Sequence, residues 1–347
     1  MKTETEARVR VGTAAVVKAA GADFAFEKRE FGQPTGRDVL VKVHACGVCH
    51  SDSFALGGGF PGLTYPVVPG HEVVGVVEEA GADVHRLKKG DRVGIGWFGG
   101  HCGYCPSCRR GDFITCVRLQ VPGITRDGGY SQYQIFPENA CAVVPEKLDS
   151  AEAAPLMCAG VTTFNALRNS NARPGDVVAI LGIGGLGHLG VQFAAKMGFH
   201  TVAIARGEEK AEFAMKLGAV DYINSQKQDV SDALNKMGGA KVVLATATDS
   251  KAMAAAVNGL GVDGTLLVVG AGMEHLDTAP VQLLGQRRNI KGWPSGTAMD
   301  SEDCLRFSAL TGVRPMIERF PFEKAKEAYE HMMRGKARFR AVLEFAK

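Results

Sequence analysis

The chain begins with short runs of alternating hydrophobic and polar residues, which turn residues separate from one another. Such runs cover residues 39–45, 73–77 and 91–95, with glycine, proline or aspartate between them. Alternation with a period of two is typical of strands in antiparallel or mixed sheets and barrels. The chain up to about residue 144 is therefore predicted to be a loop-rich β domain of barrel-like type.

The pattern changes after residue 173, where apolar strands alternate with helical segments. Strands are predicted at 177–181, 201–205, 242–246 and 265–270, and helices at 186–197 and 210–217. Alternating βαβ units specify a parallel sheet that is covered by helices on both faces. This part of the chain is predicted to be a doubly wound α/β domain.

The C-terminal part predicts one helix, at 322–334, and one short strand, at 339–345. A strand this short has to join an existing sheet, and we expect it to return to the first domain. The α/β domain is then an insertion. The predicted domains are 1–158 with 295–347, and 159–294, which suits a length of 347 residues.

Composition and charge exclude several classes of protein. With 46% hydrophobic and 22% charged residues the chain is globular, and a net charge of +3 is too small for a nucleic-acid or anionic-membrane surface. The N-terminus has no apolar core of a secretory signal, and no apolar run approaches the ~18 residues of a membrane helix. We expect a cytoplasmic protein whose nine cysteines are reduced.

Four cysteines with the spacing C-x2-C-x2-C-x7-C form the strongest single motif. They lie in a lobe at about residues 97–117, and are Cys102, Cys105, Cys108 and Cys116. Four thiolates at this spacing are able to enclose one tetrahedral Zn²⁺, and a closed shell leaves no position for a substrate. Free or disulfide-bonded cysteines are one alternative. An iron–sulfur cluster of ferredoxin type is another, but the chain lacks a second cysteine group of that kind and a Cys-Pro after the motif.

A catalytic zinc requires three protein ligands and one open position. Cys49, His71 and Cys158 are the candidates. Each of them alone also fits a buried core residue, so the interpretation depends on finding all three in one chain.

A glycine-rich loop, Gly182-Ile183-Gly184-Gly185-Leu186-Gly187, follows a predicted strand and opens a predicted helix. Gly182, Gly184, Gly185 and Gly187 would let a dinucleotide pyrophosphate approach the helix N-terminus. The next strand ends in Ala205 and Arg206, where NAD-binding chains place a carboxylate. Arg206 therefore favours NADP(H), because its guanidinium pairs with a 2′-phosphate, although Glu208 and Glu209 leave NAD(H) open.

Together these motifs resemble the zinc-containing medium-chain dehydrogenase/reductase family, nearest to alcohol dehydrogenases of bacterial and yeast type. The resemblance covers essentially the whole chain and implies a GroES-like catalytic domain joined to a Rossmann domain. It implies Cys49, His71 and Cys158 as ligands of the catalytic zinc, with Glu72 approaching the metal during ligand exchange. Asp52 would orient His71, and Ser51 would take the alcohol proton.

The resemblance also assigns residues to the cofactor and to the substrate pocket. His50 and Arg340 would meet the pyrophosphate, Thr162 and Val269 the nicotinamide, and Lys210 the ribose. Trp97 and Phe98 would wall the pocket, although both also fit core positions. The family often carries a histidine three residues after Ser51, but this chain has Phe54 there.

The expected function is reversible hydride transfer between a primary or aromatic alcohol and NAD(P), with two zinc ions per chain. A homo-oligomer, either tetramer or dimer, is expected from the family. A polyol or sugar dehydrogenase of the same family is one alternative, but such enzymes tend to use Glu where this chain has Cys158. A zinc-binding regulatory protein is the other, and the second metal set opposes it.

Overall fold

The computed structural model describes residues 9–346 and separates them into two compact units. Of the described residues, unit 1 comprises 9–158, 296–310 and 315–346, and unit 2 comprises 159–295 and 311–314. Most of the N-terminal segment from which we excluded a secretory signal, residues 1–8, lies outside the described residues. No helix in the described range 9–346 combines the length and apolarity that crossing a membrane requires.

Unit 1 is built on a seven-stranded mixed sheet. A separate two-stranded sheet comes before it in the chain. The small sheet pairs β1 (Arg10–Val17) with β2 (Phe24–Phe31). The large sheet has the order β14-β15-β3-β4-β5-β7, and β6 pairs with β3. Its strands are β3 (Asp38–Val48), β4 (Val73–Ala80), β5 (Arg92–Ile95), β6 (Tyr133–Pro137), β7 (Cys141–Val143), β14 (Ile317–Pro321) and β15 (Arg340–Glu344).

The C-terminal strand joins this first sheet, as the sequence pattern predicts. β15 lies between β14 and β3, parallel to β14 and antiparallel to β3. The helices of unit 1 are short apart from α10: α1 (Ser53–Gly57), α2 (Pro106–Arg109), α3 (Ser150–Pro155), α10 (Ala298–Thr311) and α11 (Ala325–Met333). The predicted helix at 322–334 thus begins as a 3-10 turn at Phe322–Lys324 before α11.

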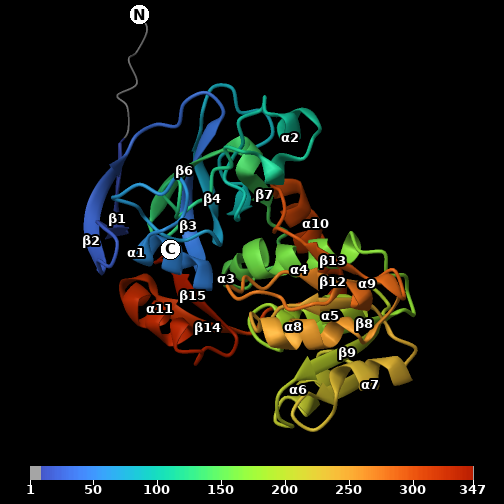
Figure 1. The fold of residues 1–347 in the computed structure, drawn as a ribbon. Helices are drawn as coiled ribbons and strands as arrows, with labels where there is room; N and C mark the ends of the chain where they lie inside the picture. The colour runs from blue at the N-terminus through green and yellow to red at the C-terminus, as the bar shows by residue number, and fades with distance from the viewer. Residues whose placement is uncertain (1–8, 347) are drawn as a thin grey trace, which may run out of the picture. The chain divides into compact units, whose positions relative to one another are not determined.

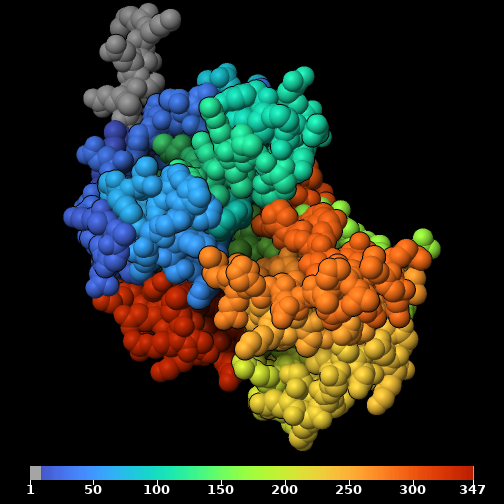
Figure 2. Space-filling model, in the orientation of Figure 1, coloured from blue at the N-terminus to red at the C-terminus, as the bar shows by residue number. Residues whose placement is uncertain are grey.

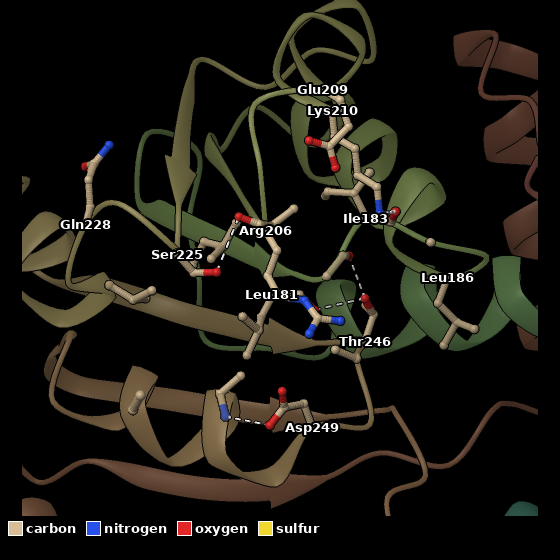
Figure 3. A pocket seen from close by; sticks show the side chains of 18 of the residues that line it. Leu181, Ile183, Leu186, Arg206, Glu209, Lys210, Ser225, Gln228, Thr246 and Asp249 are labelled. Atoms are coloured by element: carbon tan, nitrogen blue, oxygen red, sulfur yellow. Dashed lines mark hydrogen bonds between the residues drawn. The ribbon is translucent and has the colours of Figure 1, made fainter. Parts of the chain in front are cut away.

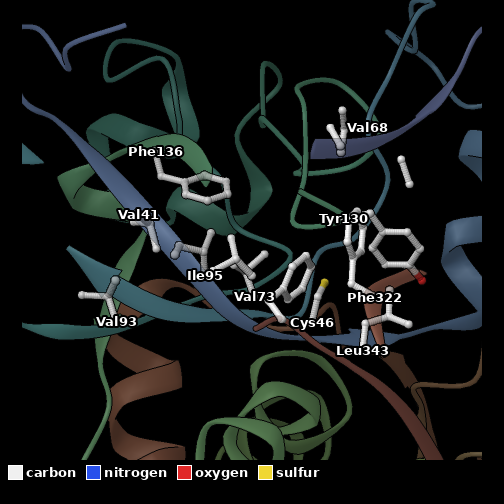
Figure 4. Packing of buried hydrophobic residues seen from close by; sticks show 14 of the residues in the cluster. Val41, Cys46, Val68, Val73, Val93, Ile95, Tyr130, Phe136, Phe322 and Leu343 are labelled. Carbon is white, nitrogen blue, oxygen red and sulfur yellow. The ribbon is translucent and has the colours of Figure 1, made fainter. Parts of the chain in front are cut away.

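The core of unit 1 gathers the inward side chains of these strands. Figure 4 shows Val41, Val73 and Ile95 packed with Phe136 and Tyr130, all of them fully or almost fully buried. β-Branched side chains are enriched here because they pack well on a pleated surface. This core holds the ends of β3, β4 and β15 in a fixed register.

Unit 2 is a six-stranded sheet in the order β10-β9-β8-β11-β12-β13, with every pair parallel (Figure 1). Its strands are β8 (Val177–Leu181), β9 (His200–Ala205), β10 (Asp221–Asn224), β11 (Ala240–Ala245), β12 (Leu260–Val268) and β13 (Asn289–Gly292). This is the doubly wound order of dinucleotide-binding folds, in which the strand order reverses between β8 and β11 while all strands stay parallel.

The helices of unit 2 connect these strands. They are α4 (Val161–Arg168), α5 (Gly187–Lys196), α6 (Ala211–Lys216), α7 (Val230–Lys236), α8 (Ser250–Val257) and α9 (Pro280–Leu284). Crossover connections are right-handed, so α5 and α8, which lead in opposite directions along the sheet, cover opposite faces. The predicted strand at 265–270 begins earlier in the structure, at Leu260, and ends at Val268, and Asp263 within it has a positive φ of 55.

Candidate metal centres and dinucleotide site

The four predicted cysteines of the lobe meet at one point in the structure. Their sulfur atoms all lie within 4.8 Å of one another. Three of the separations are 3.6 Å (Cys116 to Cys102), 3.9 Å (Cys102 to Cys108) and 3.9 Å (Cys105 to Cys116). Four sulfurs at the ~2.3 Å bond length of tetrahedral zinc lie roughly 3.8 Å apart, so the set fits the metal. Figure 2 shows the lobe as a blue-green group at the surface of unit 1.

Backbone amides donate to two of these sulfurs, whereas burial raises the pKa of a third, Cys108, to about 12. Amides of Cys108 and Val117 donate to Cys105 and lower its pKa to about 6, although burial opposes this. Cys116 accepts from the amides of Cys102, at 3.4 Å, and Arg118, at 3.3 Å. A zinc ligand must be deprotonated, so the donors favour the state that binds metal.

The second predicted set converges in unit 1 because of strand register. Cys46 on β3 pairs with Val73 on β4, so Cys49, just after β3, comes beside His71, just before β4. Cys158 arrives from a π-helical turn, Leu156–Gly160, whose Met157 packs where Gly94 and Gly96 leave room. A Cβ at Gly96 would lie 2.2 Å from the Met157 carbonyl oxygen, so this approach requires glycine.

Cys49, His71, Glu72 and Cys158 each place one ligand atom within 4.8 Å of the others. The Cys49 and Cys158 sulfurs are 4.0 Å apart. His71 is fully buried, and its Nε2 has no hydrogen-bond partner. A buried imidazole nitrogen without a partner is costly unless something binds it. Two sulfurs and this nitrogen are the donor set that zinc favours.

Burial and neighbouring charges shift the pKa values of the groups in this cluster. A hydrogen bond from Cys158, together with the charges of His71 and Arg340, holds the pKa of Cys49 well below its usual value. Burial raises the pKa of Glu72 to about 7, although Arg340 opposes it. Burial lowers the pKa of His71, but the charges of Cys49 and Asp52 outweigh it and raise the pKa overall.

Asp52 connects two of these groups. Its Oδ2 accepts the Cys49 amide at 2.9 Å and the Tyr130 hydroxyl at 3.0 Å. Its Oδ1 lies 3.1 Å from Nδ1 of His71, within ion-pair distance but without hydrogen-bond geometry. The Asp52 carboxylate therefore lies in a position from which it is able to orient the His71 imidazole.

Arg340 and Glu72 form a buried ion pair through Arg340 Nη2 and Glu72 Oε1. The pair arises from register, because Ala341 on β15 faces Val48 on β3. Arg340 also donates to the Val48 carbonyl oxygen at 3.4 Å. A Cβ at Gly47 would lie 1.8 Å from Glu72 Oε2, so glycine gives this carboxylate its place. Within unit 1 the charged partner of Arg340 is therefore Glu72. The predicted contact of Arg340 with the pyrophosphate stays a prediction.

Aromatic rings extend from His71 along one side of the cluster. Trp97 meets His71 edge to face, with ring centroids 5.1 Å apart. Phe60 is 6.1 Å from Trp97, and Phe54 is 5.3 Å from Phe60. We call Phe54, Phe60 and Trp97 the aromatic wall. Phe98, also predicted to line the pocket, is 3% exposed and lies in the core, where it stacks on His101.

In unit 2 the glycine loop follows β8 and leads into α5, as predicted. Gly182 has φ +95, and a Cβ there would lie 2.9 Å from the Ala247 Cβ. A Cβ at Gly187 would lie 1.8 Å from the Gly182 carbonyl oxygen. Gly184 has open space around it. These are the three requirements of a pyrophosphate loop, namely a tight turn, backbone approach and close helix packing. Gly185, the remaining predicted glycine, lines the cavity beside it.

A cavity of about 650 Å³ opens at the carboxyl ends of β8, β9 and β11. Ligands bind at this edge of doubly wound sheets, where the strand order reverses. In Figure 3 the Arg206 side chain extends into the cavity, and Lys210 donates to the Ile183 carbonyl oxygen at 3.2 Å. Glu209 lines the same cavity, whereas Glu208 accepts from Asn224 at 2.8 Å and pairs with Lys227 at 3.2 Å.

The remaining predicted residues lie in both units. His50 is exposed and Ser51 half-buried in the short 3-10 turn after Cys49. Thr162 is buried in α4, and Val269 is half-buried just after β12. Their roles with the cofactor and the alcohol stay predictions.

Sequence reasoning missed three residues of these sites. Tyr130 donates to Asp52, Phe60 belongs to the aromatic wall, and Thr246 donates to the Gly182 carbonyl oxygen at 2.8 Å. Only the Gly128-Gly129 pair before Tyr130 hints at a close backbone approach in the sequence. The other two have no local signal.

Comparison with known proteins identifies the class. Residues 35–146 match the family model "Alcohol dehydrogenase GroES-like domain", and residues 185–309 match "Zinc-binding dehydrogenase". Alcohol dehydrogenase patD of Penicillium expansum is 44% identical over 333 residues, which cover 95% of this chain and 96% of that protein.

Two solved structures agree with the fold. A cinnamyl alcohol dehydrogenase from Sorghum bicolor is 29% identical, with a TM-score of 0.87 over 96% of this chain and 98% of that one. A structure of CAD from Helicobacter pylori complexed with NADP(H) is 25% identical, with a TM-score of 0.85 over 97% and 99% of the two chains. A GroES-like domain and a Rossmann domain with zinc and nicotinamide chemistry define a zinc-binding dehydrogenase. The chain belongs to the zinc-containing medium-chain dehydrogenase/reductase family and is an oxidoreductase of the alcohol dehydrogenase type.

Proposed function

We propose that the protein is a zinc-dependent dehydrogenase that interconverts aromatic primary alcohols and their aldehydes, with NADP(H) favoured over NAD(H). The observation that carries this proposal is the meeting of Cys49, His71 and Cys158 beside an aromatic wall. Three ligands with an open fourth position are the catalytic form of a zinc site, whereas the four sulfurs of the lobe are the structural form. We therefore propose two zinc ions per chain.

We assign each residue of the cluster a separate role in the proposed reaction. Cys49, His71 and Cys158 would hold the metal, and Asp52 would fix the orientation of His71. Arg340 would hold Glu72 in place, so that Glu72 stays near the metal while the fourth ligand of the metal exchanges. Zinc, when bound, polarises the oxygen of the alcohol or aldehyde, and the nicotinamide, when bound, carries the hydride.

The alcohol proton needs a route out of a buried site. Ser51, one residue before Asp52, would take this proton first. The family position for the next relay group holds Phe54, whose ring packs on Phe60 and cannot carry a proton. We therefore propose that the proton leaves Ser51 by a route that does not use position 54, for which a bound cofactor would supply a ribose hydroxyl.

The substrate class follows from the aromatic wall, because flat rings pack against Phe60 and Trp97 better than polyols do. Steady-state assays of the wild-type protein with benzyl alcohol, ethanol, 2-propanol and sorbitol test the function directly. We expect the highest kcat/KM with benzyl alcohol. Phe60→Ala is expected to raise the KM for benzyl alcohol by about tenfold, the value of one aromatic contact of ~1.4 kcal/mol, with little effect on ethanol.

Phe26→Ala is the matched control, because Phe26 is 43% exposed on β2 and packs on Phe322 outside the aromatic wall. It should leave both KM values unchanged. A preference for sorbitol would favour the polyol dehydrogenase alternative, and absence of turnover with every alcohol and aldehyde would contradict the proposal.

The cofactor preference rests on Arg206, which extends into the cavity from the end of β9. Glu208 is one of two carboxylates near the end of β9 that are candidates for binding a ribose diol, and it is already engaged by Asn224 and Lys227. Arg206→Ala is expected to lower kcat/KM for NADPH about 10- to 100-fold, since a charge-assisted hydrogen bond contributes ~1.5–3 kcal/mol, and to leave NADH nearly unchanged.

Lys216→Ala removes a comparable charge from the same unit, at a side chain that is 70% exposed and pairs only with Glu212 among the ion pairs of the described residues. It should not alter either cofactor. Equal use of both cofactors by wild-type protein, with no effect of Arg206→Ala, would contradict the NADP(H) preference.

A further inference from the structure

We propose that Tyr130 is a positioning residue of the catalytic metal site, because its hydroxyl fixes the rotation of the Asp52 carboxylate. The inference rests on the proposed function, since it assumes that Cys49, His71 and Cys158 bind a metal. Tyr130 lies 78 residues from Asp52 in the chain and touches no metal ligand through its hydroxyl. Its role is therefore indirect and has to be argued from the carboxylate.

The two oxygens of Asp52 have different partners. Oδ2 receives both the Tyr130 hydroxyl, at 3.0 Å, and the Cys49 amide, at 2.9 Å. With Oδ2 held by two donors, the plane of the carboxylate is set, and Oδ1 is left 3.1 Å from Nδ1 of His71. Asp52 thus bridges the backbone of one ligand and the imidazole of another, and Tyr130 is the only one of these three partners outside the ligand set.

The packing around the Tyr130 ring does not explain why this residue carries a hydroxyl group. The ring is fully buried in the core of unit 1, where Figure 4 shows it near Cys46, Phe322 and Leu343. Its centroid is 5.8 Å from that of Phe24. A phenylalanine ring would fill the same space, and a buried hydroxyl costs free energy unless it is paired. The pairing with Asp52 is what the hydroxyl adds.

The backbone near the site is shaped around this ring. Gly70, directly before His71, has φ +100, and a Cβ there would lie 2.5 Å from the Tyr130 ring. The same ring that donates to Asp52 therefore also packs under the segment that carries His71. Both contacts act on the position of the His71 imidazole. One acts through the Asp52 carboxylate, and the other through the backbone at Gly70.

The test is Tyr130→Phe in the full-length chain, read out on the metal and not only on turnover. Wild-type and variant are loaded with zinc, and zinc release to a chromophoric chelator is followed. Loss of an outer partner of a ligand weakens metal binding 10- to 100-fold. We expect one of two zinc ions to leave about tenfold faster, and the d–d bands of the Co²⁺-substituted site to shift.

Tyr65→Phe is the matched control, since it removes one hydroxyl that donates to the Ala55 carbonyl oxygen at 2.9 Å in the same unit. It should leave release and spectrum unchanged, even where it lowers the thermal midpoint as much as Tyr130→Phe does. If Tyr130→Phe does not fold, 3-fluorotyrosine at position 130 retains the ring and strengthens the donor. A shift of the Co²⁺ bands by the fluorinated residue would then support the proposal.

Two results would overturn it, and they differ. A wild-type chain that takes up a single metal ion, in the lobe, removes the catalytic metal and the role of Tyr130 with it. A wild-type chain with two ions, whose release rate and Co²⁺ spectrum are the same in Tyr130→Phe or in the fluorinated protein, refutes the role of Tyr130 alone.

Discussion

Replacement of Cys158 by alanine is expected to lower kcat at least about a thousandfold, because it removes a ligand of the proposed catalytic zinc. A bound metal contributes several kcal/mol to stabilising charge on the reacting oxygen, and each ~1.4 kcal/mol is a factor of ten in rate. The zinc content should fall from two ions to one per chain. Dinucleotide affinity, measured by the fluorescence of bound NADPH, should stay nearly the same, since the cavity that we assign to it belongs to unit 2.

Cys141→Ala controls for the loss of a buried thiol. Cys141 is fully buried on β7, donates to the Pro137 carbonyl oxygen at 3.5 Å, and has its pKa raised to about 12 by burial. It therefore stays a thiol and takes no part in either metal cluster. The control should retain kcat within about twofold and two zinc ions. Wild-type kcat in the Cys158→Ala protein would show that catalysis does not use this site.

The features that the sequence predicts well are those with local signals. The glycine loop needs its strand, its turn and its helix within about twenty residues of chain. The lobe needs four cysteines within one short segment, and their sulfurs do meet. The parallel sheet follows from alternating strands and helices, whose order depends on handed connections that all such folds share.

Other features depend on contacts between distant strands, which a single sequence does not reveal. The ion pair of Arg340 with Glu72 depends on the register of β15 on β3, and the motif around Arg340 gives no sign of it. Phe98 and Trp97 are neighbours in sequence, but they point to opposite sides of the chain, one into the core and the other to His71. Phe60 comes from a glycine-rich loop that gives no periodic signal.

Loss of the metal of the lobe is the second large effect that we expect, and it concerns stability. Cys108→Ser should release one zinc ion per chain and unfold the lobe. The small core of the lobe consists of the cysteines themselves, with Phe113 and Leu119 packed against them. Without the metal, these sulfurs lose their common partner and the segment from Cys102 to Cys116 loses its cross-link.

The size of the effect follows from chain entropy. Closing a loop of about 15 residues stabilises a folded chain by about 3 kcal/mol. For a unit of this size, 1 kcal/mol shifts the thermal midpoint by roughly 2–4 °C, so a fall of about 6–12 °C is expected by differential scanning calorimetry. Ser107→Ala, next to Cys108 in α2, is the control and should keep both the zinc content and the midpoint. A Cys108→Ser protein that keeps two zinc ions would contradict the role of Cys108 as a metal ligand. A protein that loses one zinc ion but keeps the wild-type midpoint would show that the lobe is stable without its metal.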